Sequence, residues 1–256
     1  MADHQELAGV RALVTGASAG IGEATAVELS DRGARVALAA RRTERLRDIA
    51  ARIEDDGDAE PLVVTTDVTD PDAVDEMVAR TVDAFDGLDL VVNNAGILRQ
   101  RDRLEELPVE EYQAMRAVNI DGMFYTARAA LPHLREHGGT IVFVGSDSAK
   151  HPDPGLATYA ATKWWTRGFA LSLEAREGRN GVGVAVVHPG DTLTDINAGG
   201  RPYSEVADPD EVLGAEEVAR AIAFVAGQDS TSVVPELDIY DRDMTAGVFR
   251  IPESEH

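Results

Sequence analysis

The sequence predicts an α/β protein in three layers, with a doubly wound parallel sheet of about seven strands. Short apolar runs alternate with longer segments of helical spacing along nearly the whole chain. Strands joined through helices pair in parallel by right-handed crossovers, so helices are expected on both faces of the sheet. A chain of 256 residues suits one such domain, and we assign residues 1–256 to it.

The pattern begins with Val10–Val14, an apolar run that breaks at Thr15-Gly16. Ile21–Leu29 follows with helical spacing and ends near Gly33. Because a strand, a tight turn and a helix follow one another here, this first unit predicts the start of the doubly wound sheet.

The later elements follow the same rule, with short apolar or β-branched runs assigned to strands and longer segments with one apolar face assigned to helices. The further predicted strands are Arg35–Ala40, Pro61–Thr66, Leu88–Val92, Thr140–Val144, Val182–Val187 and Val233–Tyr240. The further predicted helices are Thr43–Asp56, Pro71–Phe85, Pro108–Arg135, Thr158–Glu177 and Ala215–Ala226. The least regular stretch, residues 191–213, is expected to be a mobile substrate loop, although a solvated connector would have the same composition.

The charge balance is strongly acidic, with 46 Asp and Glu against 24 Lys and Arg and a formal net charge of −22. Lys150 and Lys163 are the only lysines. Such a surface repels nucleic acid phosphates and anionic lipid, so we expect neither nucleic acid nor membrane partners.

A salt-rich cytoplasm would screen the repulsion among these carboxylates, which suggests a halophilic host, although simple solubility also explains an acidic surface. We therefore expect the melting temperature to rise from dilute buffer to molar salt. A protein equally stable at both ends of such a salt series would remove the halophilic hypothesis.

The sequence contains no cysteine, so it forms neither disulfides nor thiolate metal sites, in keeping with the cytoplasm. The acidic N-terminal residues lead into no long apolar segment, so no secretory signal is expected. The six histidines are scattered, which predicts no catalytic metal, and His188 is expected to be a packed histidine. A cytoplasmic protein is the expectation.

A glycine-rich turn, Thr15–Gly22, lies between the first strand and the first helix. Gly16 permits the tight turn, Gly20 lets backbone approach a pyrophosphate, and Gly22 allows close helix packing. The helix N-terminus favours the anion. A plain glycine turn is the alternative for this motif taken alone.

The second strand ends in Ala40-Arg41-Arg42, where dinucleotide-binding folds that use NAD place an acidic residue. A carboxylate would repel a 2′-phosphate, whereas guanidinium groups bind phosphate through charge and paired donors. The junction therefore predicts NADP(H) as the cofactor. The alternative is that Arg41 and Arg42 merely decorate the start of the next helix.

Two further strand ends add weaker candidates for cofactor contact. Asp67-Val68 follows the third strand and could accept from an adenine amino group, although Asp67 could equally cap a helix. Asn93, Ala95 and Gly96 end the fourth strand in residues small enough for a cofactor to lie close.

Tyr159 and Lys163 stand four residues apart in a predicted helix, so their side chains share one face. A nearby ammonium favours tyrosinate, and a tyrosine can then serve as acid in ketone reduction or as base in alcohol oxidation. Ser146 follows the fifth strand and can hydrogen-bond a substrate carbonyl. Ser148 competes for that role, and a turn-forming role is the alternative for either serine.

Four separated motifs, in this order, resemble those of the short-chain dehydrogenase/reductase family over nearly the whole chain. They are Thr15–Gly22 as T-G-x-x-x-G-x-G, Asn93–Gly96 as N-N-A-G, Tyr159–Lys163 as Y-x-x-x-K, and Pro189-Gly190 as the P-G turn. The resemblance implies a Rossmann-type fold and hydride transfer between NADP(H) and a secondary alcohol or hydroxy acid. It also implies a homo-oligomer, either a tetramer or a dimer.

The resemblance assigns roles to single residues. It makes Tyr159 the acid/base, Lys163 the group that lowers its pKa and holds the nicotinamide ribose, and Ser146 the group that steadies the substrate oxygen. Asn119 would support a proton-relay water, unless it is only a kink residue. The implied cofactor contacts are Gly16, Ser18, Gly20, Ile21, Gly22, Arg41, Arg42, Asp67, Val68, Asn93, Ala95, Gly96, Tyr159, Lys163, Pro189, Gly190, Thr192 and Thr194.

One departure from the family pattern is Asp147, which follows the proposed catalytic serine where many members have a serine pair. It could select a polar or cationic substrate group or simply face solvent. Trp164 and Trp165 are expected in the core or at a subunit interface, with Pro108–Arg135 and Thr158–Glu177 as interface helices. Family lyases or dehalogenases, and a cofactor-binding protein without turnover, are the alternative functions.

Overall fold

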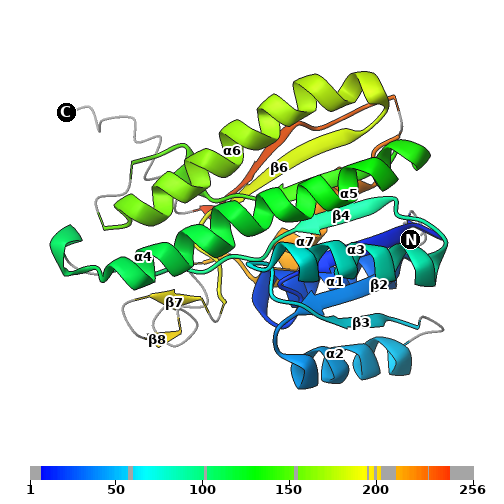
Figure 1. The fold of residues 1–256 in the computed structure, drawn as a ribbon, viewed down its shortest axis with the longest axis horizontal. Coiled ribbons are helices and arrows are strands. Elements are labelled where there is room, and N and C mark those ends of the chain that lie inside the picture. Colours follow the sequence, from blue (N-terminus) through cyan, green and yellow to red (C-terminus); the bar gives the residue numbers. More distant parts are fainter. Residues whose placement is uncertain are drawn as a thin grey trace, which may run out of the picture.

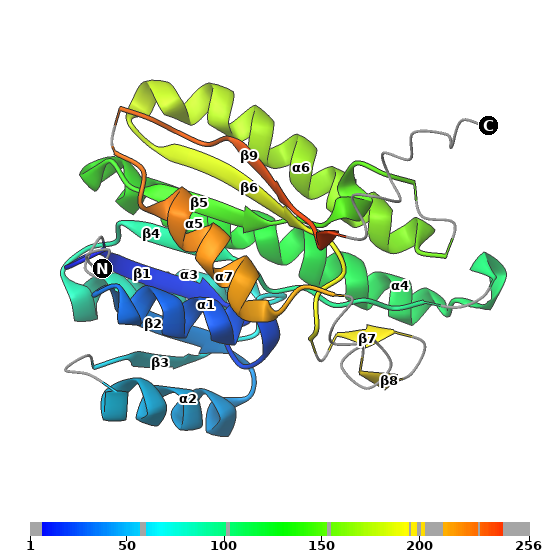
Figure 2. The same cartoon turned by 180° about the vertical axis from the view of Figure 1, so that it is seen from behind.

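The computed structural model describes residues 7–56, 60–100, 103–152, 155–194, 196–198, 201–202, 212–229 and 231–242. Its central feature is a seven-stranded sheet with the strand order β3-β2-β1-β4-β5-β6-β9, in which every neighbouring pair is parallel (Figures 1 and 2). The strands are β1 (Arg11–Thr15), β2 (Arg35–Ala40), β3 (Leu62–Thr65), β4 (Leu90–Asn93), β5 (Thr140–Val144), β6 (Gly183–Pro189) and β9 (Glu236–Ile239). The predicted doubly wound sheet is confirmed.

Helices cover both faces of the sheet and make a three-layer structure. Figure 1 shows α3, α5 and α6 on one face, and Figure 2 shows α1, α2 and α7 on the side of the other. The helices are α1 (Gly20–Asp31), α2 (Thr43–Asp56), α3 (Pro71–Phe85), α4 (Val109–Arg116), α5 (Met123–His137), α6 (Ala157–Glu177) and α7 (Ala215–Ala226).

Alternate residues of the central strands fill two separate apolar cores. Leu13 and Val91 pack into the core under α3, α5 and α6, while Val14 and Val92 pack into the core under α1, α2 and α7. Successive side chains of a strand point to opposite faces, so a strand buried on both faces must be apolar throughout. This requirement explains the uninterrupted apolar runs of the sequence.

The single long helix predicted over Pro108–Arg135 is wrong in one respect. The segment holds α4 and α5, joined by a π-helical stretch, Ala117–Gly122. Asn119 lies in that stretch, and its side-chain amide bonds the main chain of Ile97 instead of facing solvent. Wide turns of this kind interrupt α-helices mostly at functional sites, and periodicity alone does not reveal them.

The irregular loop predicted for residues 191–213 contains a short antiparallel pair, β7 (Asn197–Ala198) and β8 (Arg201–Pro202). Residues 195, 199–200 and 203–211 of that loop lie outside the described residues.

The strand order reverses between β1 and β4, and ligands bind at the carboxyl ends of such sheets beside this switch point. None of the helices in the described ranges is long and apolar enough to span a bilayer.

Candidate active site

A cavity of about 660 Å³ lies at the carboxyl edge of the sheet. It collects the turn after β1 and the segments after β2, β3, β4, β5 and β6, as the sequence predicts for a ligand site in this fold. The predicted site residues that line it are Gly16, Ser18, Gly20, Ile21, Arg41, Arg42, Asp67, Val68, Ala95, Gly96, Ser146, Tyr159, Lys163, Pro189, Gly190, Thr192 and Thr194.

The glycine turn has a conformation and a clearance that only glycine allows. Gly16 has a φ of 68°, and a Cβ built there would lie 2.8 Å from Asn94 Nδ2 and 2.9 Å from Ala95 Cα. Gly20 has a φ of 55°, so it too lies in the left-handed region. The turn leaves bare backbone at the start of α1, where a diphosphate fits the amide groups and the helix dipole.

Arg42 is folded back onto the glycine turn. Its Nε donates to Ser18 Oγ at 3.1 Å and its Nη2 donates to Ser18 O at 3.2 Å. Arg41 is exposed and lines the same end of the cavity. The guanidinium of Arg42 therefore stands next to the glycine turn, and Arg41 lines the same cavity, so both could contact a phosphate bound there.

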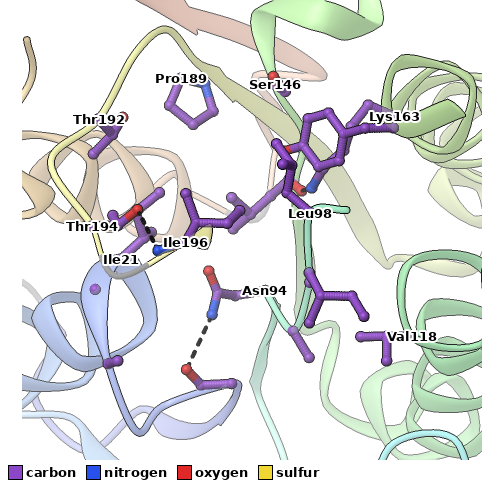
Figure 3. Close-up of a pocket in the computed structure, with 18 of the residues that line it drawn as sticks. Ile21, Asn94, Leu98, Val118, Ser146, Lys163, Pro189, Thr192, Thr194 and Ile196 are labelled. Atoms are coloured by element: carbon purple, nitrogen blue, oxygen red, sulfur yellow. Dashed lines mark hydrogen bonds between the residues drawn. The ribbon is translucent and has the colours of Figure 1, made fainter. Parts of the chain in front are cut away.

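Asn94 is a site residue that the sequence analysis missed. Its Nδ2 donates to Thr15 O at 2.8 Å, and Thr15 Oγ1 accepts from the main-chain N–H groups of Asn94 and Ala95 at 3.0 and 3.2 Å. These bonds join the turn after β1 to the turn after β4. Figure 3 shows Asn94 in the cavity, where its Nδ2 also donates to Gly16 O at 3.4 Å. The Asn93-Asn94 pair marked the site, but the sequence does not say which amide faces it.

Three predicted site residues do not line the cavity and instead support its walls. Asn93 is buried and donates to Met123 O at 2.9 Å, because alternation along β4 turns its side chain inward. A Cβ at Gly22 would lie 2.3 Å from Gly16 O, so Gly22 is needed for packing. Asn119 donates to Ile97 O and Thr162 Oγ1 and accepts from Ile97 N, so both ends of its side-chain amide are hydrogen-bonded within the protein.

Asp67 lines the cavity but also closes a local turn. Its Oδ1 accepts from the main-chain N–H and the hydroxyl of Thr69, at 3.0 and 2.8 Å. The helix cap considered for Asp67 belongs to Asp70, whose carboxylate accepts from the first N–H groups of α3. Asp67 therefore presents a carboxylate whose orientation is fixed by its own turn.

The first residues of the 191–213 loop close the cavity opposite the sheet. Gly190 N donates to Ile239 O at 2.8 Å, and Thr192 Oγ1 donates to Gly190 O at 2.9 Å. Thr194 reaches across to the glycine turn, where its Cβ would be 3.1 Å from a Cβ on Gly20. Figure 3 shows Thr194 and Ile21 on one side of the cavity, and Ser146 and Lys163 on the other.

The tyrosine, lysine and serine predicted for catalysis lie together. Lys163 Nζ lies 5.7 Å from the centre of the Tyr159 ring and donates to Val144 O at 2.9 Å. Ser146 acts on the Tyr159 phenol by hydrogen bonding, which lowers the pKa of the phenol. All three side chains are almost completely buried yet line the cavity, so a bound substrate would meet them away from bulk water.

Burial shifts the pKa values of the tyrosine and the lysine in opposite directions. It raises the pKa of Tyr159, as do Asp147 and Asp191, whereas hydrogen bonding with Ser146 lowers it. It lowers the pKa of Lys163 to about 8. Burial therefore outweighs the lowering of the Tyr159 pKa expected from Lys163, and the phenol holds its proton at neutral pH.

Asp147 does not simply face solvent. Its Oδ1 accepts from Ser146 Oγ at 2.9 Å, while Ser146 Oγ accepts from Ser148 N at 3.2 Å. Ser146, and not Ser148, acts by hydrogen bonding on the pKa of Tyr159, which favours Ser146 as the substrate-facing serine. The carboxylate is half-buried and lines the cavity beside the serine it contacts.

The end of the cavity beside Tyr159 has an apolar wall that the sequence analysis missed. Leu98, Leu156 and Ile196 line the cavity and belong to the cluster that packs around Tyr159 and Met115. These residues come from three loops without hydrophobic periodicity, so no pattern in the sequence joins them. Neither tryptophan lines the cavity. Trp164 is 48% exposed, whereas Trp165 stacks on Phe169 with ring centres 4.7 Å apart.

The doubly wound sheet, the glycine turn and the tyrosine–lysine pair define a Rossmann-type, nucleotide-dependent oxidoreductase. The family model of the short chain dehydrogenases matches residues 11–203. An uncharacterized oxidoreductase of Staphylococcus aureus is 34% identical over 229 residues, covering 89% of this chain and 95% of that protein. The chain therefore belongs to the short chain dehydrogenase family.

Two solved structures resemble the chain along nearly its whole length. A short chain dehydrogenase from Burkholderia cenocepacia, in complex with NADP, has a TM-score of 0.82 and 37% identity, covering 91% of this chain and 97% of that one. An alcohol dehydrogenase from Thermococcus sibiricus, complexed with 5-hydroxy-NADP, has a TM-score of 0.83 and 31% identity, covering 90% and 96%. Both agree with the Rossmann-type fold.

Proposed function

We propose that this protein is an NADP(H)-dependent oxidoreductase that interconverts a secondary alcohol, or a hydroxy acid, and the corresponding ketone. The observation that carries the proposal is the single cavity that joins the glycine turn and its two arginines to the Ser146–Tyr159–Lys163 group. The two solved relatives that hold NADP or 5-hydroxy-NADP support the choice of cofactor.

The residues present fit this cofactor. Gly16 leaves bare backbone for the diphosphate, Arg42 and Arg41 would hold a 2′-phosphate, and Lys163 would hold the nicotinamide ribose. When bound, the nicotinamide supplies or accepts the hydride. The chain itself supplies orientation and the movement of one proton.

Tyr159 is the proposed proton donor for ketone reduction. Its phenol holds a proton at neutral pH and lies beside Ser146, so it can protonate the substrate oxygen as negative charge develops there. In the oxidation direction the same oxygen, as tyrosinate, removes the hydroxyl proton, and the ammonium of Lys163 stabilises that charge. Ser146 orients the substrate oxygen between the two.

The substrate end of the cavity combines an apolar wall with two carboxylates. Leu98, Leu156 and Ile196 fit an uncharged substituent, while Asp147 and Asp191 act electrostatically on the Tyr159 phenol. An assay that pairs each neutral ketone with the matching keto acid, followed by NADPH absorbance, tests the proposed reaction and its preferred substrate. Absence of NADPH oxidation with every ketone would reject the reaction.

The ammonium of Lys163 gives the proposed reaction an expected pH dependence. The lowered pKa, about 8, means that the charged form is present at lower pH and is lost as pH rises through that value. We expect NADPH affinity, followed by nucleotide fluorescence, to weaken as pH rises above about 8. An affinity unchanged well above that pH would contradict a charged Lys163 as a ribose ligand.

We also propose a homo-oligomer, a dimer or tetramer, that uses the outer faces of α5 and α6. Phe124 on α5 and Trp164 on α6 are 43% and 48% exposed, unusual for large apolar side chains. Light scattering is expected to show a dimer or tetramer for the native chain and a smaller species for Trp164→Glu. Equal masses for the two, or a monomeric native chain, would contradict this interface.

A further inference from the structure

Ser146 lies where the parallel ladder between β5 and β6 ends. The register pairs Val144 with Val187, and Gly145 N donates to Val187 O at 2.7 Å. β6 then continues with His188 and Pro189, and a proline has no N–H to donate. The main chain of Ser146 is buried and must find its partners outside the ladder.

Ser146 O accepts from Ala149 N at 3.0 Å, and the imidazole of His188 is the partner of Ser146 N. Its Nδ1 lies 3.3 Å from Ser146 N and 2.9 Å from Ser146 O. The histidine is completely buried. A Cβ built on Gly145 would lie 2.4 Å from the same Nδ1, so only a glycine before the serine leaves room for the ring. The ring is therefore packed directly against the Gly145-Ser146 main chain.

Glu236 fixes the other side of the ring. His188 Nε2 lies 3.0 Å from Glu236 Oε1, and Arg167 donates to both oxygens of that carboxylate at 2.6 and 3.3 Å. Arg167 holds the pKa of Glu236 at about 2. An ionised carboxylate only accepts hydrogen bonds, so Nε2 of the neutral ring carries the hydrogen. In this tautomer Nδ1 is only an acceptor, so it accepts from Ser146 N–H and makes no hydrogen bond to Ser146 O.

The charged groups around the His188 ring come from β9, from the helix that carries Lys163 and from the segment that carries Ser146. Glu236 lies on β9, Arg167 lies on α6 one turn beyond Lys163, and Lys150 ends the short segment after Ser146. Lys150 Nζ lies 3.0 Å from Glu236 and 2.6 Å from Asp238. Burial and Lys150 lower the pKa of His188, so the ring is neutral at neutral pH. Figure 2 shows β9 beside β6 along α6.

We propose that His188, held by Glu236, is a positioning residue that sets the orientation of Ser146 against the Tyr159 phenol. The effect on turnover rests on the proposed function, whereas the effect on the Ser146 main chain does not. A small displacement of an orienting group costs a large part of the rate, because the reacting atoms leave their near-attack geometry.

Two amide variants separate the two contacts of the ring. His188→Asn places an acceptor near the position of Nδ1 and loses Glu236, whereas His188→Gln reaches Glu236 and loses the acceptor for Ser146 N–H. Asp238→Asn is the matched control, because Asp238 lies on β9 with Glu236 and shares Lys150, but it neighbours His188 only through the strand pairing and its carboxylate hydrogen-bonds neither His188 nor Ser146.

The first readout is the amide hydrogen exchange of Ser146 by NMR, which needs no substrate. We expect exchange about tenfold faster in His188→Gln than in the native chain, a smaller change in His188→Asn, and none in Asp238→Asn. Native-like protection in His188→Gln would overturn the proposal, as would protection lost equally in both amide variants.

The second readout is the kcat for the best ketone, with the KM for NADPH measured alongside. We expect kcat to fall between about 10-fold and about 100-fold in His188→Gln and less in His188→Asn. The KM for NADPH should stay within about twofold, because Ser146 contacts the substrate side. Equal kcat values for His188→Gln and the native chain would overturn the effect of His188 on turnover. A native chain without turnover would reject the proposed function instead, and the amide exchange of Ser146 would then decide whether His188 positions Ser146.

Discussion

Replacing Tyr159 with phenylalanine is expected to lower kcat between about 100-fold and about 10,000-fold, the range that a positioned proton donor contributes. The substitution removes one hydroxyl from a ring packed among Leu98, Met115 and Leu156, so the fold and the NADPH affinity should be unchanged. Steady-state turnover of the best ketone, with NADPH binding by fluorescence, measures both quantities.

Tyr112→Phe is the matched control for this experiment, because Tyr112 is 44% exposed on α4 and does not line the cavity. It should retain native kcat. A Tyr159→Phe enzyme with more than a tenth of native activity would exclude the phenol as the acid, since no other tyrosine is among the residues that line the described cavity.

Replacing both Arg41 and Arg42 with alanine is expected to reduce kcat/KM for NADPH between about 10-fold and about 100-fold. A hydrogen bond to a charged group contributes roughly 1.5–3 kcal/mol, and about 1.4 kcal/mol corresponds to a factor of ten. NADH has no 2′-phosphate, so its kcat/KM should change little. The measurement is the ratio of the two kcat/KM values in each variant.

Arg47→Ala is the control for a general effect of lost positive charge, because Arg47 is exposed on α2 and pairs with Glu44. It should leave the NADPH-to-NADH ratio as in the native chain. Equal losses with both cofactors in the double variant would refute the assignment of Arg41 and Arg42 to the 2′-phosphate.

The sequence predicted the sheet well because burial on both faces requires apolar residues on both sides of the central strands. The runs Leu90–Val92 and Ile141–Val144 contain no polar residue that could suit a solvent face. Parallel pairing and right-handed crossovers then leave few topologies. The π-helical stretch around Asn119 escaped prediction, because hydrophobic periodicity does not reveal it and Asn119 contacts Ile97, a residue distant in the sequence.

The candidate catalytic and cofactor-binding residues were predictable where they lie at fixed spacings along one helix or one turn. Tyr159 and Lys163 share a helix face, and Gly16 and Gly20 share one turn. Asp147 follows Ser146 directly in the sequence, whereas the contact with His188, and through it with Glu236, joins residues of β6 and β9 and was not predictable. Sequence reasoning treated His188 only as a packed histidine and gave no hint of its contact with Ser146.

The most direct test of the central claim uses NADPH with deuterium at both hydrogens of the reactive nicotinamide carbon. Incubation with a set of polar and neutral ketones, followed by mass spectrometry, locates the label. We predict one deuterium on the carbinol carbon of the alcohol formed by the native chain, and almost no labelled alcohol with Tyr159→Phe. Two results would contradict the claim that NADPH bound at the glycine turn passes its hydride to a ketone that Tyr159 protonates. They are an alcohol formed without that deuterium, and a chain that binds NADPH and reduces no ketone.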